Sequence, residues 1–151
     1  MSSAWFSDVD ADSPFQILAD GDYEIQLGHY REETRGAYDC LIFPFSVNGK
    51  SNIVPHEISL LSPRDPEDKA GRERSRRILR EFYTCFGVSP KSKSVTPDDF
   101  FMLKGNVKIG VNLRGYKTVE FFYPKKKCTI YDHSGKVGAQ PDPTDYTNVN
   151  F

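Results

Sequence analysis

The chain has 151 residues, which is the size of one domain with a hydrophobic core, and aromatic residues make up 13% of it. Its formal net charge is −1, so no overall excess of positive charge marks a partner. The three cysteines have no C-x-x-C spacing, and neither a leader peptide nor a run of about 18 apolar residues is recognisable. We therefore expect a cytoplasmic protein with free thiols, no membrane span, no metal and no other cofactor.

The charges are segregated along the chain. Residues 1–25 hold six acidic residues and no Lys or Arg, whereas residues 104–127 hold seven Lys or Arg against the single acid Glu120. Such segregation can create a basic surface on a nearly neutral protein. We interpret residues 1–20 as an acidic N-terminal arm.

The first half of the chain predicts three strands. Residues 21–27 alternate apolar and polar side chains, and residues 38–47 form a second strand after a polar turn at 34–36. Asn48-Gly49 is a strong hairpin signal, because both residues readily take a positive φ. Residues 52–60 predict a third strand that Pro55 places at an edge or a bulge. The expected core positions are Tyr23, Ile25, Leu27, Leu41, Phe43, Phe45 and Val47.

The second half predicts a helix and two strands. Residues 65–86 carry apolar side chains at the helical period, with Asp65 as the N-cap and Gly87 as the C-terminal stop. Strands are expected at 106–113 and 116–123. The expected inward side chains are Ile78, Leu79, Phe82, Tyr83, Phe86, Val107, Ile109, Val111, Leu113, Val119, Phe121 and Tyr123. Phe122 falls on the outward parity of its strand, so it is either exposed or covered by the N-terminal arm.

Three strands, one helix and two further strands are the element order of a five-stranded Greek-key barrel of the OB type, with its helix between the third and fourth strands. We predict a mainly β, OB-like domain over residues 21–127. Residues 128–151 show no periodicity and are expected to form a flexible C-terminal tail.

Catalytic signatures are lacking: the sequence has no G-x-G-x-x-G, Walker, H-E-x-x-H or G-x-S-x-G motif. Asp98-Asp99 follow Thr96-Pro97, where carboxylates are favoured by capping and the helix dipole. His56 and Glu57 are neighbours in a predicted strand and point to opposite faces. The sequence therefore predicts no catalytic residues, and we do not expect an enzyme.

Rings and cations gather in the two loops that flank the ligand groove of an OB barrel. Bases of an unpaired strand stack on aromatic rings, and Lys or Arg neutralise its phosphates. An alternative for Tyr30 and Tyr38 is that they are half-buried rings, and the lysine run can simply protect an edge strand. The candidate nucleic-acid-binding residues are Tyr30, Arg31, Arg35 and Tyr38 in the first loop; Arg114, Tyr116 and Lys117 in the second; and Lys108, Lys125 and Lys126 beside them.

The C-terminal segment resembles the tails of single-strand-binding proteins of replication. It has a Gly/Gln/Pro-rich run, the acids Asp142 and Asp145, and the terminal aromatic residue Phe151. The resemblance implies that these three residues dock on replication or recombination proteins.

The chain resembles a family of small phage and prophage proteins, long described as a domain of unknown function. The carrying stretches are "ILADGDYEIQL", "LIFPFSVNGK", "ILREFYTCFGV" and "LKGNVKIGVNL", within residues 5–123. The resemblance implies an OB-like fold and binding of single-stranded DNA, without sequence specificity, during replication or recombination in the host cytoplasm. It implies no catalytic residues and is compatible with an oligomer. The alternative function is a protein–protein adaptor or inhibitor that uses the same barrel face.

Overall fold

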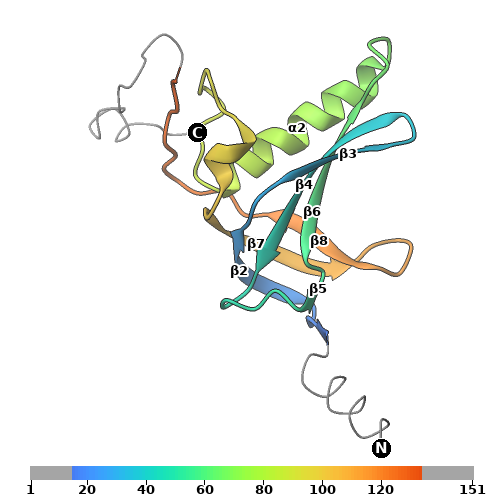
Figure 1. Ribbon diagram of the computed structural model, residues 1–151, viewed down its shortest axis with the longest axis vertical. Coiled ribbons are helices and arrows are strands. Elements are labelled where there is room, and N and C mark those ends of the chain that lie inside the picture. Colours follow the sequence, from blue (N-terminus) through green and yellow to red (C-terminus); the bar gives the residue numbers. More distant parts are fainter. Residues whose placement is uncertain (1–14, 134–151) are drawn as a thin grey trace, which may run out of the picture.

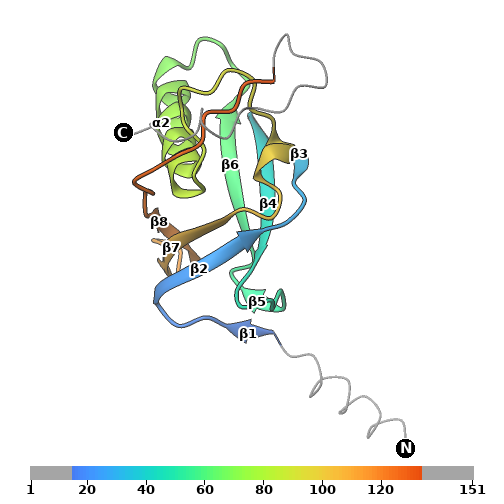
Figure 2. The same cartoon turned by 90° about the vertical axis from the view of Figure 1, so that its left-hand side faces the viewer.

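A computed structural model describes residues 15–133 of the chain. The described part is mainly β, with one α-helix and an open, antiparallel six-stranded sheet (Figures 1 and 2). No helix in this part is long and apolar enough to cross a membrane. In chain order the elements are β1 Gln16–Ile17, β2 Gly21–Leu27, β3 Arg31–Arg35, β4 Tyr38–Ser46, β5 Ile53–Val54, β6 Glu57–Pro63, α2 Lys69–Cys85, the 3-10 helix η1 Pro97–Phe100, β7 Lys104–Val111 and β8 Lys117–Phe122.

The strand β2 confirms the first predicted strand. Ile25 and Leu27 are buried, while Tyr23 is half-buried against the same core. The ladder between β2 and β7 runs from Gly21 opposite Ile109 to Gln26 opposite Lys104. The first strand therefore joins the fourth predicted strand, which lies about 80 residues later in the chain.

The segment assigned to the first loop is mostly strand. Residues Arg31–Arg35 form β3, pair with β4 along their whole length, and turn back at Gly36, whose φ is 58°. The turn at Gly36 lies within the predicted range, but Arg31–Arg35 were assigned to the loop because every residue of β3 is polar. An entirely polar strand has no hydrophobic alternation to reveal it.

The third predicted strand is divided at Pro55, which follows a cis peptide bond with Val54. The first piece, β5, pairs in parallel with β1, so residues 16–17 are joined to the body of the protein. The second piece, β6, pairs with β4 from Pro44–Glu57 to Tyr38–Pro63. Leu18, just after β1, is buried in the core.

The helix α2 begins later than predicted. Asp68 rather than Asp65 is the N-cap, and its carboxylate accepts a hydrogen bond from Gly71 N at 3.0 Å. A Cβ at Gly71 would lie 2.8 Å from Pro63 Cγ, so glycine lets the first turn approach the end of β6. Gly87, with a φ of 79°, ends the helix as predicted.

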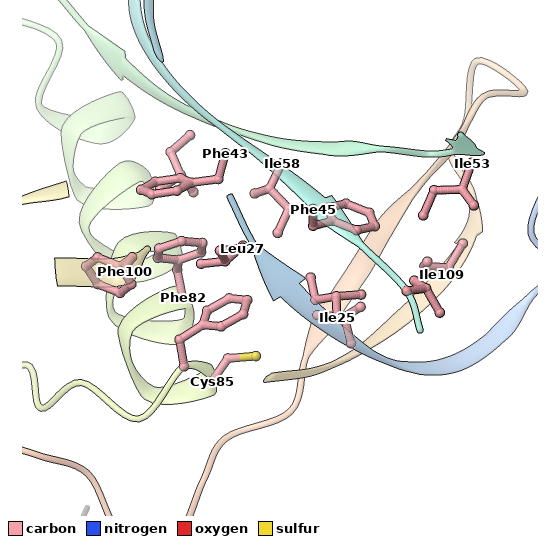
Figure 3. Close-up of a cluster of buried hydrophobic side chains, with 14 of the residues drawn as sticks. Ile25, Leu27, Phe43, Phe45, Ile53, Ile58, Phe82, Cys85, Phe100 and Ile109 are labelled. Carbon is pink, nitrogen blue, oxygen red and sulfur yellow. The ribbon is translucent and has the colours of Figure 1, made fainter. Parts of the chain in front are cut away.

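A cluster of phenylalanines joins the helix to the sheet. The ring centroid of Phe82 lies 5.0 Å from that of Phe43 on β4, 5.0 Å from Phe100 on η1 and 5.8 Å from Phe122 on β8. Figure 3 shows Phe43, Phe82 and Phe100 close to Leu27 of β2 and Ile58 of β6. Contacts of this kind contribute about 0.5–1.5 kcal/mol each beyond the burial of apolar area.

A closed five-stranded barrel is not shown. Within the described residues no ladder joins β6 to β8, the pair that would close the barrel. The helix α2 lies along β6 in Figures 1 and 2, and the hydroxyl of Ser75 donates to Leu61 O at 2.7 Å. The helix therefore satisfies one backbone carbonyl of the edge strand β6.

A β-bulge reverses the predicted faces of β8. The register shifts between Lys108 and Ile109, so that Phe122 lies opposite Val107 and Phe121 lies opposite Lys108. Phe122 consequently packs on the core, whereas Phe121 is 48% exposed. Their predicted orientations were wrong because an inserted residue changes the parity of every later position.

The predicted inward positions at the end of the fourth strand are also wrong. Val111 and Leu113 are exposed, because the hairpin between β7 and β8 extends beyond the core. On α2, Ile78 and Leu79 are about one-third exposed, while Phe82 and Phe86 are buried as predicted.

Residues 128–133, assigned from the sequence to a flexible tail, lie against the body of the protein. Ser89 N donates to Thr129 O, and Thr129 N donates to Gly87 O, both at 2.8 Å. Cys128 is buried, as are Cys40 and Cys85, and all three are free thiols. Burial raises the pKa of the Cys85 thiol to about 12, so this thiol stays protonated at neutral pH.

The reversed faces of β8 predict different effects for two neighbouring substitutions. Phe122→Ala should lower the free energy of unfolding by about 2 kcal/mol or more, because it removes a ring packed on Phe82. Phe121→Ala should change it by less than about 1 kcal/mol. Urea denaturation measures both. The opposite order of the two effects would contradict the bulge.

Candidate nucleic-acid interface

Two hairpins carry most of the predicted binding residues. The first hairpin, β3–β4, carries Arg31, Arg35 and Tyr38, and the second hairpin, β7–β8, carries Lys108 and Lys117 with Arg114 and Tyr116 at its tip. In Figure 1 both hairpins project toward the same side of the molecule. The tip of the first hairpin is bonded to the residue after β6, since Arg64 N donates to Ala37 O at 3.0 Å.

The outer face of the first hairpin is polar but covers buried residues. The register places Arg31 beside Ile42, Glu33 beside Cys40 and Arg35 beside Tyr38. Ile42 and Cys40 are buried, yet they lie on the strand face opposite to Phe43 and Phe45, which belong to the main core. The apolar stems of Arg31 and Arg35 are thus suited to shielding this second layer.

Both arginines of this face are already paired with carboxylates. Arg31 Nη1 lies 2.9 Å from Glu57 Oε2 and its Nε lies 3.2 Å from Glu33 Oε1, while Arg35 Nη2 lies 2.9 Å from Glu33 Oε2. We call these four residues the ion-pair cluster. Hydrogen bonds from Arg31 and Arg35 lower the pKa of Glu33, and bonds to Glu57 and Glu33 raise the pKa of Arg31. A phosphate must compete with these carboxylates for the two guanidinium groups.

The two tyrosines of the first loop differ. The ring of Tyr30 packs on the core, with its centroid 6.2 Å from that of Phe43, so it matches the alternative of a half-buried ring. Tyr38 is 39% exposed next to Arg35. Of the two, only Tyr38 offers a stacking surface without rearrangement.

The tip of the second hairpin is well defined by hydrogen bonds. Asn112 Oδ1 accepts from Arg114 N at 2.9 Å and from Tyr116 N at 3.1 Å, and Gly115 has a φ of 85°. The side chains of Leu113 and Tyr116 are strongly exposed. Arg114 has no ion-pair partner among residues 15–133. The tip therefore holds an apolar side chain, a free guanidinium and an open ring on a short, ordered turn.

The predicted lysines have different surroundings. Lys117 forms an ion pair with Asp20, and Lys125 Nζ donates to Lys104 O at 2.8 Å. Lys108 is exposed on the outer face of β7, opposite Asp22 on one side and Phe121 on the other. Lys126 is exposed. Lys108 and Lys126 are thus more available to an anionic partner than Lys117, whose cation is already satisfied.

Two aromatic residues of the outer face were predicted to point inward. Phe121 and Tyr123 lie with ring centroids 5.0 Å apart, and the Tyr123 hydroxyl donates to Asp22 Oδ1 at 2.7 Å. This hydrogen bond also raises the pKa of Tyr123. The sequence held no signal for the exposed Phe121 ring, because the bulge that turns it outward follows from the pairing with β7.

The acidic pair at the start of η1 has the predicted capping role. Asp99 Oδ2 accepts from Thr96 N at 2.8 Å, and Asp99 Oδ1 lies 3.1 Å from His133 Nε2. Between Phe15 and His133, no group of three or more His, Cys, Asp or Glu side chains could hold a metal ion. Asp142, Asp145 and Phe151, the predicted docking residues of the tail, lie outside the described residues.

Comparison with known proteins gives no relative for this chain: no family model matches it, and no curated protein matches its sequence. A function for the two hairpins therefore has to be argued from their geometry.

The ion-pair cluster predicts an unusual titration of Glu33. The pKa of the Glu33 carboxyl group is lower in the folded protein than in the unfolded chain. The cluster therefore stabilises the fold at any pH above the pKa that Glu33 has in the unfolded chain. This stabilisation is lost as the pH falls through the pKa that Glu33 has in the folded protein. Carboxyl-carbon NMR should give Glu33 a lower midpoint than ordinary exposed glutamates. Replacing Arg31 and Arg35 by Gln should restore the ordinary midpoint. An ordinary midpoint in the wild-type protein would contradict the cluster.

Proposed function

We propose that this chain is a non-enzymatic, OB-like protein that binds single-stranded DNA without sequence specificity. The bases of the DNA would stack on exposed rings of the two hairpins, and the phosphates would contact the cations near these rings. A role in replication or recombination, in a phage or its bacterial host, is part of this proposal and derives from the family resemblance.

The connectivity of the strands supports an OB-like assignment. If β2 and β3 are counted as one long strand bent at Gly28, the order is three strands, a helix and two strands. The first strand then pairs with the second and the fourth, and the fourth pairs with the fifth, as in an OB barrel. The described structure departs from an OB barrel in that β6 and β8 are not paired with each other, and α2 lies beside this gap.

The observation that carries the proposal is the tip of the second hairpin. The ring of Tyr116 is 67% exposed, and Arg114, which forms no ion pair within the described part of the chain, lies beside it on a turn fixed by Asn112. Stacking of a base on an aromatic ring contributes roughly 1–3 kcal/mol, and little ordering is needed when the turn is already formed. The same hairpin carries the exposed Lys108 and Phe121 further along its strands.

A protein–protein adaptor or inhibitor is the second candidate function. It is favoured by the ion-pair cluster, which neutralises Arg31 and Arg35, and by the exposed Leu61 and Leu113 near the two hairpins. Salt dependence separates the two functions. Strand binding weakens steeply with salt, by roughly 0.7 in log K per log salt for each phosphate neutralised, whereas an apolar interface is far less sensitive.

Binding of a fluorescein-labelled oligo-dT of about 16 nucleotides, followed by anisotropy at low salt, tests the proposal. The double variant Arg114→Glu, Tyr116→Ala should lose at least about tenfold in affinity, because it removes one ring and reverses one charge. Its unfolding free energy should stay close to that of the wild type, since both side chains are exposed.

Lys50→Glu provides the matched control. Lys50 is exposed on the Asn48–Gly49 turn after β4, and this change reverses one charge away from the second hairpin. Its affinity for oligo-dT should remain within about twofold of wild type if binding is local. Absence of any oligo-dT binding by the wild type at low salt, or equal affinity for a duplex of the same length, would refute the proposal.

A further inference from the structure

A groove beside the helix combines an exposed ring with free arginines. The groove has a volume of about 370 Å³ and lies between one flank of α2, which contributes Arg77, Arg80 and Thr84, and the end of β8, which contributes Phe121 and Pro124. We call it the aromatic groove. Its volume lies at the lower end of the range for small-molecule sites, about 300–1,000 Å³. None of the sequence predictions includes this surface.

The Phe121 ring is held in place by its contact with Tyr123. It packs edge-to-face on Tyr123, and Tyr123 is in turn bonded to Asp22. The ring nevertheless keeps 48% of its surface exposed, and it forms part of the groove wall. A flat, exposed and laterally fixed ring of this kind is a stacking platform.

The charges around the aromatic groove favour an anionic occupant. Arg77 and Arg80 are exposed on α2, and neither is paired with a carboxylate of the described chain. Glu81 also lines the groove and is the one acid there. Lys108 lies opposite Phe121 on the neighbouring strand. This contrasts with the ion-pair cluster, where both guanidinium groups are already bound by Glu33 and Glu57.

The aromatic groove is continuous with the second hairpin. Tyr116 precedes β8 and Phe121 lies near its end, so the backbone positions of the two residues are about 17 Å apart along a single strand at the usual rise per residue. A short run of unpaired nucleotides can therefore contact both rings without crossing the core. We propose that the aromatic groove binds one nucleotide of the same bound strand, with its base on Phe121 and its phosphate on Arg77 and Arg80.

This inference rests on the proposed function, and a pair of substitutions at one position separates the two. Phe121→Leu keeps an apolar side chain but removes the ring, whereas Phe121→Tyr keeps the ring. On an oligo-dT of about 16 nucleotides, Phe121→Leu should weaken binding roughly 5- to 100-fold, and Phe121→Tyr should stay within about twofold of wild type. Arg77→Gln combined with Arg80→Gln should also weaken binding and reduce the salt dependence. Arg74→Gln, on the same helix but not lining the groove, should have little effect.

Cross-linking gives an independent measurement. An oligo-dT with 5-iodouracil in place of thymine, irradiated in complex with the wild-type protein and analysed by mass spectrometry, should link to a peptide that contains Phe121. If the wild type binds oligo-dT, but Phe121→Leu binds it equally well and no cross-link to Phe121 forms, the aromatic groove does not bind a nucleotide. The proposed function would still stand. No binding of oligo-dT by the wild type would overturn both. Equal losses in Phe121→Leu and Phe121→Tyr would also overturn it, because stacking requires the ring alone.

Discussion

The packing of rings around Phe82 is the interaction on which the other features of the molecule depend. One helical side chain contacts Phe43 at the base of the first hairpin, Phe122 at the base of the second and Phe100 of η1. Fixing α2 at this point also places Arg77 and Arg80 beside Phe121. The positions of the exposed residues of both hairpins are therefore set by a buried cluster that none of them belongs to. The helix also contacts both strands that the open side of the sheet leaves unjoined, through the bond from Ser75 to Leu61 O on β6 and the contact of Phe82 with Phe122 on β8.

The electrostatics of the two hairpins differ in a way that matters for any anionic partner. On the first hairpin, Arg31 and Arg35 are bound by Glu33 and Glu57 above a small buried layer of Cys40 and Ile42. Two of the three side-chain nitrogens of each arginine are engaged in these ion pairs. Among residues 15–133, Arg114 on the second hairpin and Arg77 and Arg80 on α2 form no ion pair. We infer that an anionic partner binds mainly to the second hairpin and the aromatic groove. The first hairpin would contribute only contacts at the edge of the interface.

The sequence predicted those elements that have a hydrophobic periodicity or need a particular residue type at a turn or a helix end. The strand with Ile25 and Leu27, the Asn48-Gly49 turn, the stop at Gly87 and the capping by Asp99 are of this kind, since each depends on residues close in sequence. The polar strand β3 and the outward turn of Phe121 were not predictable in this way. The first lacks apolar residues, and the second depends on a bulge against β7. Likewise, the pairing of Arg31 with Glu57 joins two strands that are far apart in the sequence. The sequence thus predicted which two hairpins carry the candidate residues. It predicted only in part which of these residues are exposed and unpaired in the described structure.

The central claim is that an unpaired DNA strand binds along the second hairpin. A titration of isotope-labelled protein with oligo-dT, followed by amide NMR spectra at low salt, tests it most directly. The account predicts progressive shifts at Arg114, Tyr116 and Phe121, with unchanged signals for buried residues such as Ile25 and Val107. Shifts confined to the ion-pair cluster, or no shifts at all, would contradict it.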